Sequence, residues 1–180
     1  MSWPHNEELP IVIDVEASGF GVGSYPIEIG VVMSDGRTHC RLIRPEPDWV
    51  HWEPAAEAIH ELDRDTLVRA GRPAAEVAHW LNGLLQGRVV YSDAWGQDYT
   101  WLSRLYDAAQ SRPTFRLEAL AGLLAEPEMS IWHAVRDAVE SRLGERRHRA
   151  STDARVIQQT LQRVRRSGGQ LQRYDAAPVA

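Results

Sequence analysis

The sequence predicts an α/β protein in which a mixed five-stranded sheet is flanked by helices. Three observations predict this class. Three apolar, β-branched runs come first, and Asp35-Gly36 supplies a tight hairpin turn between the second and third. Short strands then alternate with amphipathic helical patterns, which is typical of a mixed sheet with helices on its faces. The length of 180 residues suffices for one domain with a proper core. The predicted strands are residues 9–16, 27–33, 38–44, 88–92 and 114–117.

Helical periodicity fills most of the chain after residue 53. Asp63 is a cap at the start of one short helix, and Gly87 ends a longer one whose apolar stripe includes Val77 and Leu81. The run Ser167-Gly168-Gly169 predicts the end of the last helix, which places Val164 inward. The predicted helices are residues 54–62, 64–70, 73–86, 98–109, 118–125, 131–143 and 151–166.

Composition favours one ordinary globular domain over residues 1–180. Hydrophobic residues make up 43% and charged residues 25% of the chain. We expect a core over about 9–166 and a flexible tail over 167–180. The apolar runs are too short to cross a bilayer, so no membrane partner is expected. Residues 1–10 do not form a secretory signal, and the single cysteine, Cys40, fits a reducing compartment, so a cytoplasmic location is expected.

Charge is distributed unevenly along the chain. The net charge is −5, and all 20 basic residues are arginines, which a compositional bias of the genome would explain. Residues 136–166 hold nine arginines against four acids, whereas the remainder is strongly acidic. An acidic protein is a poor non-specific binder of nucleic acid, but one basic segment beside a metal-neutralised acidic cleft would still attract phosphate.

Two carboxylates interrupt the first predicted strand, at Asp14 and Glu16. Because side chains alternate along a strand, both point to the same face. Like charges among buried apolar residues repel each other and lose hydration, and a hard divalent cation such as Mg²⁺ would offset that cost. The alternative is a sheet edge whose polar face carries two acids.

Two further acids lie at strand ends or helix starts. Asp98 follows the fourth predicted strand, and Asp153 lies in the first turn of the last helix, five residues after His148. Chemistry in such sheets gathers at strand ends and the loops beyond them. The helix dipole also favours an acid in a first turn and explains either residue without a metal.

These residues carry a resemblance to a known family. The run Asp14-Val15-Glu16-Ala17-Ser18-Gly19 is similar to the first motif of the DEDDh 3′→5′ exonucleases, the group of proofreading exonuclease subunits, ribonuclease T and oligoribonuclease. The strand Ile27-Glu28-Ile29-Gly30 resembles a family strand, and His148-Arg149-Ala150-Ser151-Thr152-Asp153-Ala154 resembles the third motif throughout. The resemblance covers roughly residues 9–166 in the family's order.

The second motif departs from the family pattern. Asp98 and Leu102 match, but Asp93, Ala94 and Gln97 stand where the family has His, Asn and Phe. Asp98 is therefore the expected third acid, and Asp93 could assist or replace it. The missing Asn puts the usual substrate contacts in doubt.

The resemblance implies a ribonuclease H-like fold and a metal-dependent phosphodiester hydrolase. Two divalent ions, Mg²⁺ or Mn²⁺, would clamp the attacking and leaving oxygens of an in-line displacement. By analogy, Asp14 bridges both ions, Glu16 and Asp153 complete one site, and Asp98 holds the other. His148 takes the proton from the attacking water, since imidazole titrates near working pH.

The expected substrate is the 3′ end of single-stranded DNA or RNA, released as 5′-mononucleotides. The expected contacts are backbone amides around Ser18 and Gly19 at the 3′-hydroxyl and the ring of Phe20 against the base. Trp95 could add stacking, whereas Trp101 is expected in the core. The other histidines are expected at the surface or hydrogen-bonded, apart from His60, whose place in the family suggests a substrate contact.

Two other classes of function stay open. One is a catalytically weak or inactive relative that binds nucleic acid, which the altered second motif suggests. The other is a partner-docked proofreading or RNA-processing subunit with a helical patch around Ile131-Trp132. Several members of the family are dimers, so a homodimer is possible. The four acids and His148 argue against an inactive relative.

Overall fold

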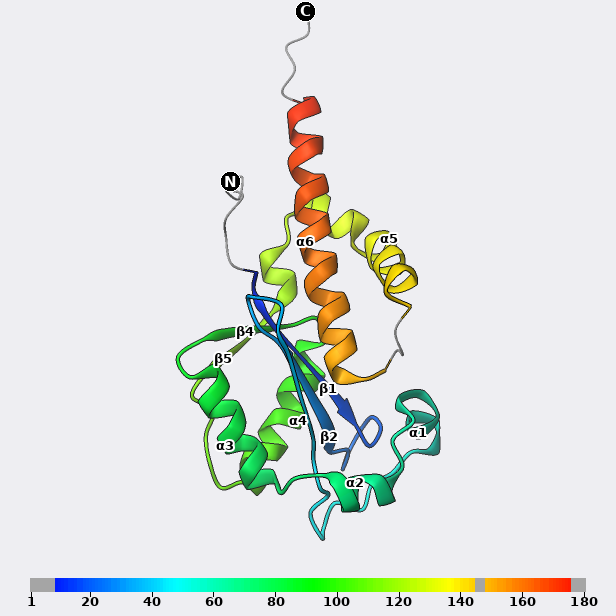
Figure 1. Ribbon diagram of the computed structural model, residues 1–180, viewed down its shortest axis with the longest axis vertical. Coiled ribbons are helices and arrows are strands. Elements are labelled where there is room, and N and C mark those ends of the chain that lie inside the picture. The colour runs from blue at the N-terminus through cyan, green and yellow to red at the C-terminus, as the bar shows by residue number, and fades with distance from the viewer. Residues whose placement is uncertain (1–8, 145–147, 176–180) are drawn as a thin grey trace, which may run out of the picture.

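The fold is a five-stranded mixed sheet with helices on both faces (Figure 1). The computed structural model describes residues 9–144 and 148–175, and only the backbone of 168–175. The strand order is β3-β2-β1-β4-β5; β1, β2 and β3 pair antiparallel as the predicted meander, and β4 and β5 run parallel to β1. The strands are β1 (Ile11–Ala17), β2 (Pro26–Val32), β3 (Thr38–Leu42), β4 (Val89–Ser92) and β5 (Arg116–Ala119).

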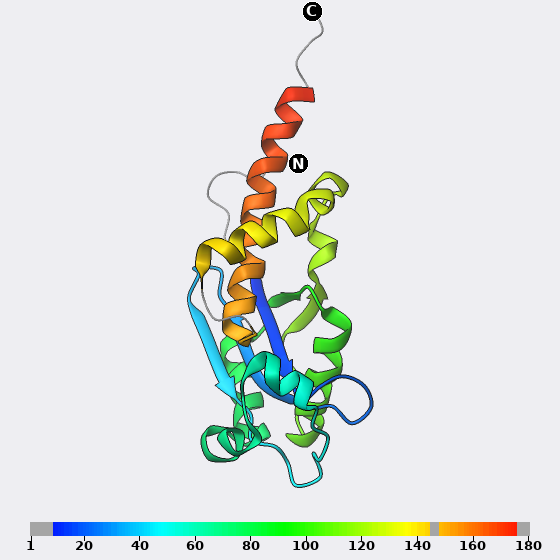
Figure 2. The same cartoon turned by 90° about the vertical axis from the view of Figure 1, so that its right-hand side faces the viewer.

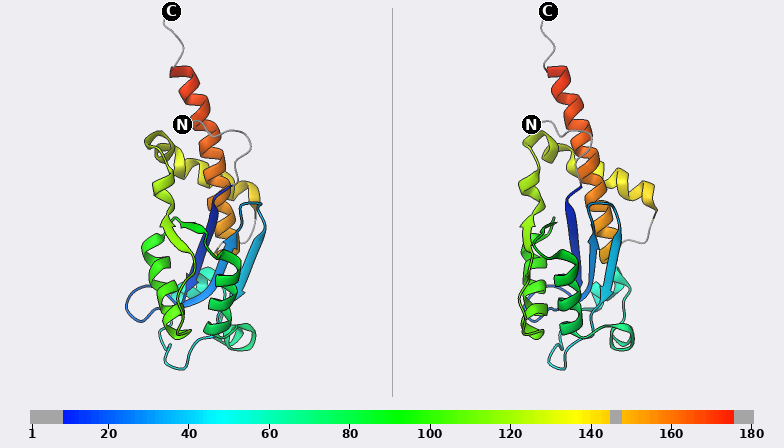
Figure 3. Two further views of the ribbon diagram at one scale, coloured as in Figure 1. Left: turned by 90° about the vertical axis from the view of Figure 1, so that its left-hand side faces the viewer. Right: turned by 60° about the vertical axis from the view of Figure 1, so that its left-hand side comes forward.

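The helices lie in two layers. Helices α3 and α4 cover one face of the sheet, and α6, backed by α5, covers the other (Figure 3). Figure 2 shows α5 lying across α6 on the outer side of this second layer. The helical elements are α1 (Pro54–His60), α2 (Arg64–Ala70), α3 (Ala74–Leu85), α4 (Trp95–Ala108), the 3₁₀ turn η1 (Leu120–Leu123), α5 (Glu126–Leu143) and α6 (Ala150–Asp175).

The alternation along β1 assigns its side chains to the two layers. Ile13 and Val15 join the core under α3 and α4, whereas Val12 joins the core under α6. Asp14 and Glu16 share the parity of Val12, so both acids lie on one face, as the sequence predicted, and this is the face that α6 covers. Burial of both faces explains why β1 reads as an apolar run except at these two positions.

Helix α6 packs unusually close to the sheet because β2 offers it a glycine. A Cβ atom added at Gly30 would lie 2.1 Å from the backbone carbonyl carbon of Ala150 and 2.2 Å from the backbone nitrogen of Ser151. Further along the helix, the Gln158 side chain donates hydrogen bonds to the backbone oxygens of Pro10 and Met33, at 2.8 and 2.9 Å. These contacts fix how far α6 slides along the sheet.

Most predicted elements are present, with four corrections. Helix α5 begins at Glu126, not at 131. Helix α4 begins at Trp95, not at 98, so Asp98 lies inside its first turn. The predicted helix at 118–125 is wrong: β5 extends to Ala119 and only one 3₁₀ turn follows. The predicted helix end at Ser167-Gly168-Gly169 is also wrong, because α6 continues to Asp175. Glycine lowers helix stability by about 1 kcal/mol relative to alanine but does not forbid a helix.

The expected docking patch around Ile131-Trp132 is not an exposed surface. Trp132 is 8% exposed, and both residues pack with α6 in the second core cluster. Within residues 9–144 and 148–175, no helix combines the length and apolar character that a bilayer-crossing segment needs. The flexible tail and the single-domain boundary stay predictions, and residues 176–180 lie outside the described chain.

We predict that Gly30→Ala destabilises the protein by about 1–3 kcal/mol, the usual cost of overpacking, because the new methyl group overlaps the α6 backbone. At about 2–4 °C per kcal/mol, thermal denaturation should shift down by several degrees. Gly83→Ala is the matched control: it lies in open space on α3 and should leave stability equal or higher by up to about 1 kcal/mol. Equal Tm values for the two variants would contradict the close packing.

Candidate active site

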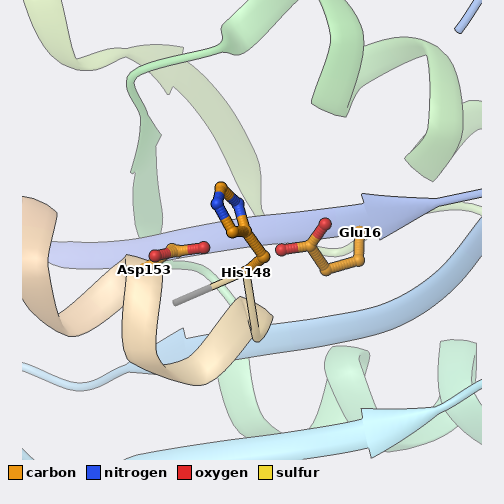
Figure 4. Close-up of side chains that lie close together, drawn as sticks. All are labelled: Glu16, His148 and Asp153. Atoms are coloured by element: carbon orange, nitrogen blue, oxygen red, sulfur yellow. The ribbon is translucent and has the colours of Figure 1, made fainter. Parts of the chain in front are cut away.

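Three side chains from distant parts of the chain meet at the end of β1. A ligand atom from each of Glu16, His148 and Asp153 lies within 4.8 Å of the others. Figure 4 shows the two carboxylates pointing toward each other, with the imidazole ring beside them. Glu16 comes from β1, His148 from the segment before α6, and Asp153 from the first turn of α6. The first and third sequence motifs are therefore neighbours in space.

A buried glutamate on β2 holds the start of α6 at this position. Glu28 is fully buried and pairs with Glu16 in the β1–β2 register. Its carboxylate accepts hydrogen bonds from the Arg149 guanidinium at 2.6–3.2 Å and from the Ala150 amide at 3.0 Å. The Cys40 thiol donates a further one at 3.0 Å. Because these partners adjoin His148, the contacts place the histidine as well as the helix.

The backbone of His148 has a left-handed conformation, with φ of 59°. For a residue other than glycine this conformation costs about 1–2 kcal/mol. The adjacent Arg149 offsets that cost through its ion pair with Glu28. Of the arginines expected around His148, Arg146 and Arg147 lie outside the described residues, and Arg149 is engaged by Glu28.

Asp98 reaches the site from the opposite helical layer. It is 1% exposed, and the Ser92 hydroxyl at the end of β4 donates a hydrogen bond to its Oδ2. No hydrogen-bond donor meets its buried Oδ1 among the residues that the structure describes. A buried carboxylate oxygen without a donor is costly and fits a position that a cation would complete.

The acids raise one another's pKa values. Burial raises the pKa of Asp14 well above its usual range, and the charges of Asp98, Glu16 and Asp153 raise it further. Burial, then the charge of Asp153, raises the pKa of Glu16 to about 8. Burial raises the pKa of Asp98 to about 7, although the hydrogen bond from Ser92 opposes the shift. Asp14 is thus electrostatically linked to the cluster of three as well as to Asp98.

The donor set suits a hard divalent cation. Asp14, Glu16, Asp98 and Asp153 offer carboxylate oxygens, and the His148 imidazole lies beside two of them, Glu16 and Asp153. Mutual repulsion among partly buried acids is the condition that a bound cation relieves. The structure thus brings together the five residues expected from the first and third motifs and from Asp98.

Asp93 takes a different role from Asp98. Its Oδ2 accepts an ion-paired hydrogen bond at 2.6 Å from Nη1 of Arg136 on α5, and Arg136 also contacts Glu140 at 3.1 Å. The charge of Asp93 still contributes to the raised pKa values of Asp14 and Asp98. Asp93 therefore influences the site from a neighbouring ion pair, whereas Asp98 is buried within the site.

The expected substrate-contacting loop follows β1 directly. Ser18 is fully buried, whereas the Phe20 ring is 65% exposed and lies 5.9 Å from the Trp101 ring, centroid to centroid. Trp101 is in the core, as predicted, and its indole nitrogen donates to the Ser24 hydroxyl at 2.9 Å. Phe20 is thus a ring presented to solvent on a buried aromatic support.

His60 is not exposed to a substrate in this structure. It is 3% exposed, and its Nδ1 accepts a hydrogen bond from the Leu62 amide at 3.1 Å. Its Nε2 has no partner among the described residues. Burial lowers its pKa, which keeps the ring neutral at physiological pH.

Sequence reasoning missed several groups that shape the site. Glu28 carried a signal, because an acid stood inside an apolar strand. Ser92 and Arg136 carried no such signal. Serine is common at strand ends, and Arg136 lies far in sequence from its partner Asp93. The sequence pointed to Trp95 as a stacking residue but not to Tyr99. The two exposed rings stack at 5.3 Å between centroids in the first turns of α4.

The fold is shared with known exonucleases. Exonuclease I of E. coli in complex with a dA16 oligonucleotide superposes with a TM-score of 0.63 at 13% identity, covering 89% of this chain and 43% of that one. The zinc-bound complex of the same E. coli enzyme with single-stranded DNA gives 0.56 at 14% identity, covering 73% and 31%. Exonuclease I of Methylocaldum szegediense gives 0.51 at 15% identity, covering 71% and 30%.

These likenesses establish the ribonuclease H-like α/β fold that the motifs predicted. The chain spans less than half the length of the enzymes it superposes on. No protein-family model matches the sequence, and no curated protein matches it either.

We predict that, with metal removed, stability falls as pH rises. The raised pKa values of Glu16, about 8, and Asp98, about 7, mean that the folded state holds protons that the unfolded state has lost. That stabilisation is complete below about pH 4 and is lost as pH rises through 7–8. In EDTA, the Tm should therefore drop by roughly 5 °C between pH 6 and 8.5. Added Mg²⁺ or Mn²⁺ should restore it, and more so at the higher pH.

Asp14→Asn should raise the Tm in EDTA at pH 8 and reduce the gain from metal, because it removes one of the repelling charges. Asp107→Asn, an exposed change on the outside of α4, is the control and should alter neither quantity. A Tm at pH 8 that is the same with and without divalent metal would contradict the cation site.

Proposed function

We propose that this chain is a metal-dependent 3′→5′ exonuclease that hydrolyses single-stranded DNA or RNA to 5′-mononucleotides. The observation that carries the proposal is the cluster of Glu16, His148 and Asp153, to which Asp14 and the buried Asp98 are electrostatically linked. Phosphodiester hydrolysis needs oxygen ligands for cations and one group that accepts a proton from water. This cluster offers both, on a fold shared with exonucleases.

Asp14, Glu16, Asp98 and Asp153 would hold two divalent ions, Mg²⁺ or Mn²⁺. When bound, such ions stabilise the charge that develops on the attacking and leaving oxygens of the phosphodiester. The acids are partly or fully buried, and this burial limits the access of bulk water to their oxygens. Ser92 orients Asp98 through its hydroxyl.

His148 is the proposed general base. Its ring lies within 4.8 Å of both Glu16 and Asp153, and it emerges from a segment that Glu28 anchors at the next residue. A neutral imidazole accepts the proton of the attacking water at one ring nitrogen, which raises the nucleophilicity of the oxygen.

Exposed rings flank α4 and offer stacking surfaces for bases. Phe20 lies beside Trp101 of α4, and Trp95 and Tyr99 form a stacked exposed pair on its first turns. Trp95 is held in place because its indole nitrogen donates to the backbone oxygen of Leu117 at 3.1 Å. Stacking on such rings contributes about 1–3 kcal/mol per base without sequence preference, which suits a general single-strand nuclease.

A nucleic-acid-binding protein without turnover is the second candidate function. The observation that favours it is the ion pair between Asp93 and Arg136 in the altered second motif. The proposal also includes a cytoplasmic location and a homodimer. The third alternative, a partner-docked subunit, is not supported by the expected patch around Ile131-Trp132, because Trp132 is buried.

The proposal is tested with 5′-labelled DNA and RNA single strands in Mg²⁺, Mn²⁺ or EDTA. We expect stepwise shortening from the 3′ end with either metal and none in EDTA.

Asp98→Asn should abolish turnover, whereas Asp93→Asn should weaken it only partly, because Asp93 acts from an ion pair with Arg136. Binding without shortening on every strand would favour the second candidate. An inactive Asp93→Asn beside an active Asp98→Asn would reverse the roles of the two acids.

We predict that His148→Ala loses about 10²–10⁴ in single-turnover rate at saturating substrate, the usual contribution of a general base. Strand affinity and metal-induced stabilisation should persist, because the loss arises in the transition state. His79→Ala, an exposed histidine on α3, is the control. An unchanged single-turnover rate combined with weaker binding or a lower Tm would make His148 a phosphate contact or a capping residue instead.

A further inference from the structure

A carboxylate from the segment before α1 covers the loop that follows β1. Glu53 Oε2 accepts a hydrogen bond from the Phe20 amide at 3.1 Å, and the Glu53 amide donates to the Ser18 backbone oxygen at 2.9 Å. The Glu53 side chain is 42% exposed, so its oxygens can still meet a ligand from solvent. The negative charge of Glu53 therefore lies beside Gly19 and Phe20, the loop residues three and four positions after Glu16.

The position of this carboxylate is set by an oriented series of hydrogen-bonding groups. The Tyr25 amide donates to the Ser18 hydroxyl oxygen at 3.1 Å, so the hydroxyl hydrogen is free to point to Nδ1 of His51 at 3.0 Å. Nε2 of the same ring lies 3.5 Å from Glu53 Oε1. Glu53 Oε2 thus meets the Phe20 amide and Oε1 lies near the His51 ring, and these two contacts hold the carboxylate in place.

The loop is shaped to receive this carboxylate. Gly19 has φ of 139°, a conformation that other residues rarely adopt, and a Cβ atom there would lie 2.5 Å from both Cδ and Oε2 of Glu53. Gly19 is therefore needed for two reasons: its backbone conformation, and the space that its missing side chain leaves for Glu53.

We propose that Glu53 is a specificity-determining residue that selects strands ending in a free 3′-hydroxyl over strands ending in a 3′-phosphate. The inference rests on the proposed function, in which residues 18–20 meet the terminal nucleotide. A carboxylate accepts a hydrogen bond from a hydroxyl group, whereas it repels a terminal phosphate, which carries a charge of about −1.5 to −2 at pH 7.

The surrounding charges support selection at this end of the strand. The Glu53 carboxylate adds a negative charge to the end of the site where β1 leads into the loop, and its side chain contacts the Phe20 amide and the His51 ring. An internal phosphate is a monoanion whose charge the cations of the site would offset. A terminal phosphate carries a larger negative charge and would place that charge beside the Glu53 carboxylate.

The test compares two strands of the same sequence that differ only in a 3′-hydroxyl or a 3′-phosphate end. Initial rates give the ratio of kcat/KM for the two ends, and hydrolysis of the phosphorylated strand is recognised by release of a nucleoside 3′,5′-bisphosphate. We expect the wild-type protein to prefer the hydroxyl end by at least about tenfold. Glu53→Gln, which removes the charge and keeps an acceptor for the Phe20 amide, should compress this ratio by about tenfold.

Asp48→Asn, an exposed neutralisation in the same loop, is the control and should leave the ratio unchanged. A relative gain of activity on the phosphorylated strand cannot arise from partial unfolding, and Glu53→Ser should compress the ratio in the same direction. Fluorescence anisotropy of both strands in EDTA measures the same preference without turnover.

Activity on the hydroxyl strand with no preference between the two ends would overturn the role of Glu53 and leave the exonuclease proposal standing. A ratio that Glu53→Gln does not change, even with a lower Tm, would make Glu53 a structural brace and overturn the inference as well. Absence of turnover on both strands would instead count against the exonuclease, and the anisotropy ratio would then decide the role of Glu53 by itself.

Discussion

The site depends on one ion pair, between the fully buried Glu28 of β2 and the half-buried Arg149 at the start of α6. Burial alone would raise the pKa of Glu28, but hydrogen bonds from Arg149, Cys40 and the Ala150 amide outweigh it and lower the pKa. Removing the arginine from such a pair typically costs about 3–5 kcal/mol, because the glutamate charge stays buried and unpaired. The contact thus fixes the beginning of α6, and with it His148 and Asp153.

The acidic cluster is the opposite case, because its interactions destabilise the folded chain. Asp14, Glu16 and Asp98 have raised pKa values, and burial is the largest cause of each shift. Repulsive clusters of this kind persist where function requires them and the rest of the structure compensates. The packed core on both faces of the sheet and the Glu28 ion pair supply that compensation here.

The two helical layers make different contributions to the same site. Helix α6 brings Asp153 over the sheet face that carries Asp14 and Glu16, and close packing at Gly30 allows it to approach. Helix α4 follows β4, the parallel neighbour of β1, and so delivers Asp98 from beside the strand. The loop after β1 adds Phe20 and, through Glu53, a further carboxylate at the proposed position of the strand end.

The sequence alone determined the class of fold, most of the elements and the identity of the acids. Alternation in β1 requires Asp14 and Glu16 to share a face, and local periodicity and caps define most helices, because these patterns depend on near neighbours in the chain. Only the tertiary structure decided which polar groups are partners: Arg136 for Asp93, Ser92 for Asp98, Arg149 for Glu28 and Glu53 for the Phe20 amide. It also decided that α6 passes through Gly168-Gly169, where propensity predicted an end. Such pairings depend on where whole elements lie in space, and no local pattern in the chain encodes the distance between two residues that lie far apart in sequence.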